Sequence, residues 1–74
     1  MRSEKINQVF SKRLAEAVEM SGKSYKELAE HLGVNKATVS MYLHGKALPS
    51  LPTFYKISDF LDVTSDFLLG KSEL

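Results

Sequence analysis

The chain has 74 residues, a formal net charge of +1 and no cysteine. That length encodes one small domain, which we expect to span residues 1–74 with its core in residues 6–70. The lack of cysteine excludes disulfides, thiolate nucleophiles and thiolate metal ligands. No apolar run is long enough for a signal peptide or a membrane span, so we expect a cytoplasmic protein that does not contact a membrane. The sequence leaves open whether the chain is complete or a fragment.

Two helices are predicted in the first half of the chain. The first covers about residues 4–21 and ends before Gly22, which can adopt a left-handed conformation. Its apolar stripe consists of Ile6, Val9, Phe10, Leu14, Ala17 and Val18. The second begins at Ser24, because this serine and Glu27 three positions later form a capping-box pattern, and it ends at Gly33. Its expected buried face consists of Tyr25, Leu28, Ala29 and Leu32.

A third helix is predicted to begin at Asn35, which is a strong N-cap residue, and to end at Gly45. Val34 precedes the cap and is placed to pack on Val39 at the fourth helical position. The link to the second helix is too short for an antiparallel hairpin of long helices. It suits a helix-turn-helix, in which Gly33 gives the turn its positive φ. Ala29 is small where the two helices approach each other.

Two more helices are predicted in the last third of the chain. Ser50 caps the fourth, with Pro52 in its first turn, where a missing N–H does no harm. Its expected apolar face consists of Leu51, Phe54, Ile57, Phe60 and Leu61. Thr64 opens a short fifth helix that stops at Gly70. Its apolar residues Phe67, Leu68 and Leu69 either complete the core or contribute to a dimer contact. Five short helices with short links predict a compact all-α domain.

The third helix separates into two faces when its residues are placed at intervals of about 100°. The core face consists of Thr38, Val39, Tyr42 and Leu43. The opposite face consists of Lys36, Ala37, Ser40, Met41 and His44. This second face suits the DNA major groove, because lysine and serine can hydrogen-bond to base edges and apolar side chains can contact a thymine methyl. The alternative is the ordinary solvated side of a surface helix, which shows the same pattern.

Charge and helix ends indicate where a DNA backbone could be held. The N-terminus of the third helix favours a phosphate near Asn35, and Thr38 and Lys46 could contact the backbone from the two ends of the helix. Residues 22–50 hold four lysines and two acidic residues, whereas residues 51–74 hold two lysines and four acidic residues. The basic middle of the chain therefore favours an anionic partner there.

Several short pieces of the sequence, taken in order and spacing, resemble the Cro/lambda-repressor-like helix-turn-helix family, including xenobiotic-response-element-type regulators. The pieces are Phe10, Arg13-Leu14, Gly22-x-Ser24, Leu28-Ala29, Leu32-Gly33-Val34, Thr38-Val39-Ser40, Tyr42, Gly45-Lys46, Pro49-Ser50, Ile57, Leu61 and Val63-Thr64-x-Asp66-x-Leu68-Leu69-Gly70. The resemblance covers residues 10–70. It implies a five-helix, lambda-repressor-like DNA-binding domain with the helix-turn-helix at its second and third helices.

The resemblance also implies a prokaryotic or phage-type transcriptional regulator, and we expect a repressor. Its third helix, about residues 35–44, would enter the major groove of double-stranded DNA at an inverted-repeat operator, with the protein as a homodimer. The family's base-reading positions fall on Lys36, Ala37, Ser40 and Met41. Its phosphate-contacting positions fall on Tyr25, Asn35, Thr38 and Lys46, with His44 and Lys23 as neighbours.

Two departures from the family pattern bear on this interpretation. Many members have glutamine where this chain has Tyr25, which leaves the phosphate contact of the tyrosine open. Many members also pair an arginine late in the first helix with a glutamate near the end of the third, where this chain has Val18 and Leu43. Packed hydrophobic residues can replace a buried ion pair, whereas losing one half of the pair is costly. We therefore infer a direct contact between Val18 and Leu43.

Other kinds of site find less support. The two histidines, His31 and His44, lie on different helices, so we expect no metal site and no cofactor. Helix capping explains Ser24 and Ser50, and with no assembled catalytic group we do not expect an enzyme. Arg13 lies near the core stripe and could reach a phosphate or a carboxylate. The low net charge leaves one alternative function open, a protein-interaction module that is antitoxin-like or regulator-binding, with weak or no DNA binding.

Overall fold

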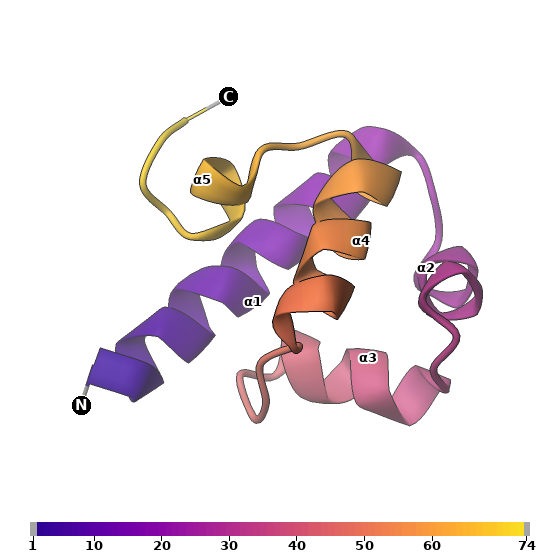
Figure 1. The fold of residues 1–74 in the computed structure, drawn as a ribbon, viewed down its shortest axis with the longest axis horizontal. Coiled ribbons are helices and arrows are strands. Elements are labelled where there is room, and N and C mark those ends of the chain that lie inside the picture. Colours follow the sequence, from indigo (N-terminus) through magenta and orange to yellow (C-terminus); the bar gives the residue numbers. More distant parts are fainter. Residues whose placement is uncertain (1, 74) are drawn as a thin grey trace.

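Five α-helices joined by short links build the fold (Figure 1), in a computed structural model that describes the backbone of residues 2–73 and the side chains of residues 6–73. The helices are α1 (Arg2–Ser21), α2 (Tyr25–Leu32), α3 (Lys36–Leu43), α4 (Leu51–Leu61) and α5 (Ser65–Leu68). No strand occurs among the described residues, so the predicted all-α, five-helix class is confirmed. α1 is the longest helix and packs against α3, α4 and α5, while α2 packs against α3 and α4.

The four predicted N-caps are confirmed, and each uses a side-chain oxygen to accept the backbone N–H three residues later. The capping box of α2 is complete: Ser24 Oγ accepts from the Glu27 N–H at 3.0 Å, and the Glu27 carboxylate accepts from the Ser24 N–H at 2.7 Å. Ser50 Oγ accepts from Thr53 at 3.4 Å. A cap of this kind stabilises a helix by about 1 kcal/mol, so local sequence determines where these helices begin.

Apolar side chains from all five helices meet in one core. The fully buried members are Phe10, Leu14, Ala17, Val18, Leu28, Ala29, Leu32, Val39, Tyr42, Ile57, Leu61, Phe67 and Leu68. Val34, Leu43, Phe54 and Phe60 are partly buried and pack against this cluster. The core therefore takes in Phe67 and Leu68 of the short last helix, which favours the core interpretation of these two residues over a dimer contact.

Two residues predicted to be buried are exposed. Tyr25 retains 40% of its accessible surface and Leu51 retains 77%. Each is the first residue of its helix, directly after the N-cap. Side chains on a helix lean toward its N-terminus, so a side chain at this position projects past the end of the helix. Burial of such a residue requires another element to extend past the end of the helix, and among the described residues neither side chain is covered in this way.

Candidate nucleic-acid interface

The turn between α2 and α3 sets the angle of the candidate reading helix. Gly33 closes α2 in the left-handed conformation with φ of 73°. The next residue, Val34, donates its N–H to the Ala29 carbonyl at 3.1 Å, and Asn35 then caps α3. The chain thus leaves one helix and enters the next within three residues. The predicted helix-turn-helix is present, and α3 lies along one edge of the molecule in Figure 1.

The two predicted faces of α3 separate as expected. Val39 and Tyr42 are buried at 2% and 7% exposure, and Thr38 and Leu43 are half-buried. Burial raises the pKa of the Tyr42 phenol above its usual value near 10, so this side chain stays neutral in the core. The opposite face is solvent-exposed and consists of Lys36, Ala37, Ser40, Met41 and His44. It carries no carboxylate, and the first turn of α3 holds no acidic residue.

The N-terminal end of α3 is organised by Asn35. Its Oδ1 accepts from the Thr38 backbone N–H at 3.0 Å and from the Thr38 hydroxyl at 3.1 Å. The hydroxyl proton of Thr38 is therefore engaged within the protein, whereas the Asn35 amide keeps its N–H donors. Of these two predicted phosphate-contacting residues, Asn35 is better prepared to donate to a phosphate, and Thr38 would first have to turn its hydroxyl outward.

The C-terminal end of α3 is tied to α1 by a residue that sequence reasoning missed. Asn7 Nδ2 donates to the Gly45 carbonyl at 3.1 Å, across 38 positions of sequence. Its Oδ1 is buried without a hydrogen-bond partner among the described residues. In the turn that follows α3, Lys46 donates its backbone N–H to the Met41 carbonyl at 2.9 Å, and its side chain is exposed. The sequence offered one signal for the role of Asn7, a polar residue next to Ile6 of the apolar stripe of α1.

Two of the predicted phosphate-contacting residues lie on or just before α2. Tyr25 begins α2 and is exposed. Lys23 precedes α2, and its ammonium lies 5.1 Å from the centre of the Phe60 ring of α4. His31 stacks on that same ring at 4.3 Å, with the planes 18° apart. Lys23 is thus held toward α4, and it would have to leave this cation–π contact to reach a phosphate beside α3.

The described residues give no support for a metal site, a catalytic serine or a membrane-spanning helix. Among the described residues, no three histidine, cysteine or acidic side chains come close enough to hold a metal ion together. Ser24 and Ser50 serve as helix caps. Within the described part of the chain, no helix combines the length and the apolar character that crossing a membrane requires.

Comparison with known proteins agrees with this architecture. A family model described as Helix-turn-helix, HTH_3, matches residues 14–68. The chain is 38% identical over 65 residues to the HTH-type transcriptional regulator ImmR of Bacillus subtilis, covering 88% of this chain and 51% of that protein. It is also 38% identical over 61 residues to the SPbeta prophage-derived uncharacterized HTH-type transcriptional regulator YonR of the same species, covering 82% and 56%.

A third relative and a solved structure extend this likeness. The cryptic phage CTXphi transcriptional repressor RstR of Vibrio cholerae is 28% identical over 62 residues, covering 84% of this chain and 55% of that protein. The chain thus spans about half the length of the curated relatives it matches. A crystal structure of an HTH_3 family transcriptional regulator from Vibrio cholerae superposes with a TM-score of 0.79 at 20% identity. It covers 95% of this chain and 39% of the other, and this likeness supports the fold.

Proposed function

The chain belongs to the helix-turn-helix family HTH_3, and from that premise we propose that it is a sequence-specific DNA-binding repressor of transcription. The family comprises transcriptional regulators and not enzymes. One observation carries the proposal: α3 presents an exposed face that holds a lysine, a serine, a histidine and two apolar side chains but no carboxylate. An α-helix with such a face fits the major groove, where a carboxylate would be repelled by the phosphates.

Four residues of α3 read bases in this proposal. Lys36, in the first turn, donates to guanine acceptors, and Ser40 one turn later hydrogen-bonds to a base edge. Ala37 and Met41 contact thymine methyl groups, for which the 45% exposure of Met41 leaves enough apolar surface. The N-terminal half of the helix points into the groove, as in other helix-turn-helix proteins.

Phosphates are held around this helix. Asn35 donates from the N-terminal end of α3, where the helix dipole adds positive potential. Lys46 reaches the backbone from the turn after α3, and the Tyr25 hydroxyl reaches it from the start of α2. Thr38, His44 and Lys23 add contacts where their side chains reorient. These contacts fix the register of the protein on DNA, whereas the residues of α3 supply the sequence preference.

The operator is an inverted repeat that a homodimer binds, with α3 of each copy in successive major grooves. One small domain contacts only a few base pairs, and two copies related by a twofold axis double the contacted sequence. Bound to a promoter, the dimer represses by blocking access of other proteins to the DNA.

Selection of bound sequences from random duplex DNA tests this function, because the bound pool itself reveals the operator sequence. We expect an inverted repeat with half-site centres about 10 base pairs apart, and an affinity that falls steeply as salt rises from about 50 to 200 mM. Recovery of no sequence preference, together with binding to a protein partner that persists in salt, would instead establish the protein-interaction module.

A further inference from the structure

Ser40 and His44 lie one turn apart on the exposed face of α3 and meet through a single ring nitrogen. Nδ1 of His44 lies 2.8 Å from the backbone carbonyl oxygen of Ser40 and 3.2 Å from its hydroxyl oxygen. A carbonyl oxygen can only accept a hydrogen bond, so the nitrogen at 2.8 Å carries the proton. The contact therefore requires a proton on Nδ1. Both the neutral Nδ1–H tautomer and the imidazolium meet this requirement.

That proton decides which way the Ser40 hydroxyl bonds. The single Nδ1–H is shared between two acceptors, the carbonyl oxygen at 2.8 Å and the hydroxyl oxygen at 3.2 Å, so the hydroxyl oxygen accepts and its own proton points elsewhere. Three serines in other helices use their protons differently. The hydroxyls of Ser11, Ser21 and Ser58 donate to the carbonyl three residues earlier, at 2.9, 2.8 and 2.9 Å. The side-chain contact of Ser40 is to His44 instead, which leaves its O–H free to donate to a group outside the protein.

We propose that His44 is a positioning residue that turns Ser40 into a hydrogen-bond donor toward the DNA. The inference rests on the proposed function, in which α3 reads bases. A free serine hydroxyl tolerates donor and acceptor base edges alike. One lone pair of the Ser40 oxygen accepts from His44 and the O–H proton points outward, so Ser40 favours an acceptor edge, such as guanine O6 and N7 or thymine O4. It favours these edges over that of cytosine, whose N4 amino group could be met only through the remaining lone pair of the hydroxyl.

The same geometry redefines the predicted phosphate contact of His44. In the neutral ring, Nε2 carries no proton and cannot donate to a phosphate oxygen. Neutral His44 therefore acts on DNA through Ser40, and only the imidazolium adds a direct phosphate contact. Because Nδ1 is protonated in both states, the polarity of Ser40 is the same in both.

Two substitutions of His44 that are equal in size test whether it acts through Ser40 or only as a surface residue near the DNA. His44→Asn places an amide N–H where Nδ1–H lies, so it can still donate toward Ser40. His44→Asp places a carboxylate oxygen there, which takes the hydroxyl proton and turns the free side of Ser40 into an acceptor. The experiment titrates each protein against duplexes that carry each base pair in turn at every operator position. The proteins are the parent chain, both His44 variants, Ser40→Ala and the double variant Ser40→Ala/His44→Asp. Thermal melting first verifies that each variant is folded.

We expect one operator position at which the parent prefers guanine or thymine over cytosine by about two- to tenfold, the value of one net hydrogen bond. His44→Asn keeps that ratio, and His44→Asp removes or inverts it. Ser40→Ala loses the ratio, and adding His44→Asp to it changes nothing further at that position. His44→Asp also weakens binding to every sequence through its charge, so the ratio between bases is the measurement.

Two results overturn the inference and differ from each other. If His44→Asp weakens all sequences equally and the base preference at every position persists, His44 does not act through Ser40, although DNA reading by α3 still holds. If the parent chain shows no base preference at any position, the proposed function itself fails and this inference fails with it.

Discussion

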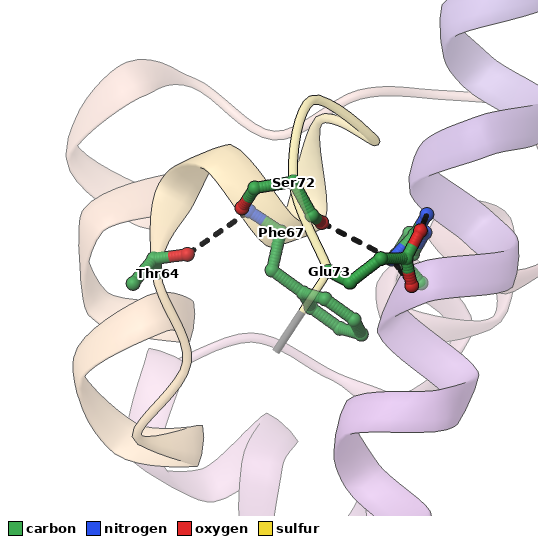
Figure 2. Close-up of polar contacts among 5 residues, drawn as sticks. Thr64, Phe67, Ser72 and Glu73 are labelled. Carbon is green, nitrogen blue, oxygen red and sulfur yellow. Dashed lines mark hydrogen bonds and ion pairs between the residues drawn. The ribbon is translucent and has the colours of Figure 1, made fainter.

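The guanidinium carbon of Arg13 lies 4.7 Å from the centre of the Phe67 ring, so that one side chain of α1 covers the aromatic residue that anchors α5. The same guanidinium contacts the C-terminal segment: it donates to the Ser72 carbonyl at 3.4 Å and pairs with the Glu73 carboxylate at 3.1 Å. Figure 2 shows Phe67 of α5 together with Ser72 and Glu73 of this segment. The two kinds of contact differ in burial. Phe67 is 3% exposed, whereas the Glu73 side chain is 85% exposed.

That difference in burial predicts unequal effects of two substitutions. We expect Arg13→Ala to lower the free energy of unfolding by about 1–2 kcal/mol, since it removes a cation–π contact and the apolar stem that covers the ring. Glu73→Gln should cost less than about 0.5 kcal/mol, because an ion pair with a largely solvated partner contributes little. Urea unfolding followed by circular dichroism measures both. Equal losses would show that the ion pair, and not the ring contact, holds α5 to α1.

Gly70 provides a second test of how α5 meets α1. A Cβ at this position would lie 2.5 Å from Val9 Cγ1, and the backbone φ is +76°. Gly22 has nearly the same φ, +74°, but no atom lies within 4 Å of its Cβ position. Gly22→Ala therefore measures backbone strain alone, about 1 kcal/mol, and Gly70→Ala adds overpacking, for about 2–4 kcal/mol in total. Similar melting temperatures for the two variants would mean that Val9 moves aside without cost.

Signals between residues close in the chain predicted most of the fold. Each N-cap depends on residues three positions apart, so Ser24 and Asn35 could be assigned from their neighbours alone. The predicted burial of Tyr25 and Leu51 was wrong, because burial at the first residue of a helix depends on whether another helix extends that far. For Arg13 the sequence left open a phosphate or a carboxylate, and the structure pairs it with a carboxylate. That this partner is Glu73, 60 residues away, follows no periodicity and could not be predicted from the sequence.

For the candidate site, periodicity predicted which residues of α3 share a face but not how they hydrogen-bond. The helical repeat alone places Ser40 on the exposed face of α3 and Val39 on the core face. The engagement of the Thr38 hydroxyl by Asn35, and of Ser40 by His44, depends on side-chain rotamers that the repeat does not specify. Asn7 was missed for a related reason, since its partner is a backbone carbonyl 38 residues away. Contact of any of these residues with DNA remains a prediction.

The inferred contact between Val18 and Leu43 can be tested by restoring charge at both positions. Val18 is 3% exposed, and Leu43 is half-buried and packs on the same core cluster. Leu43→Glu should therefore cost about 2–3 kcal/mol, because the glutamate keeps part of its hydration. If the two side chains face each other, the double variant Val18→Arg/Leu43→Glu will be more stable than the sum of the single losses predicts. Strict additivity in urea unfolding would exclude the contact.

Burial of Tyr42 predicts a loss of stability at high pH. Desolvation raises the pKa of this phenol in the folded state above the unfolded value of about 10. The folded protein therefore binds the proton more tightly, and the resulting stabilisation is present below about pH 10 and is lost as pH rises through the folded pKa. Tyr42→Phe should flatten the fall of melting temperature between about pH 9 and 11, whereas Tyr55→Phe, at a position 68% exposed, should not. Identical pH profiles for both variants would contradict this linkage.

Truncating the exposed lysine at either end of α3 is expected to weaken DNA binding in a different way. Lys36 opens the helix on the proposed base-reading face, and Lys46 lies in the turn beyond it. Lys36→Ala should cost about 1–3 kcal/mol on the selected operator and relax the preference at one base pair, since a base contact discriminates. Lys46→Ala should weaken operator and random DNA alike. It should also reduce the steepness of log Kd against log salt by about one, because one phosphate contact releases about one counterion.

Titration of each variant against operator and random duplexes at several salt concentrations separates these roles. Lys56→Ala on α4, exposed and of the same charge, is the matched control for a general change in net charge. The control should shift both affinities slightly and leave the base preference intact. An equal loss on operator and random DNA for Lys36→Ala would move that lysine to the phosphate backbone. A change in base preference for Lys46→Ala would mean that the turn after α3 enters the groove, and the reading surface would then have to extend beyond the helix.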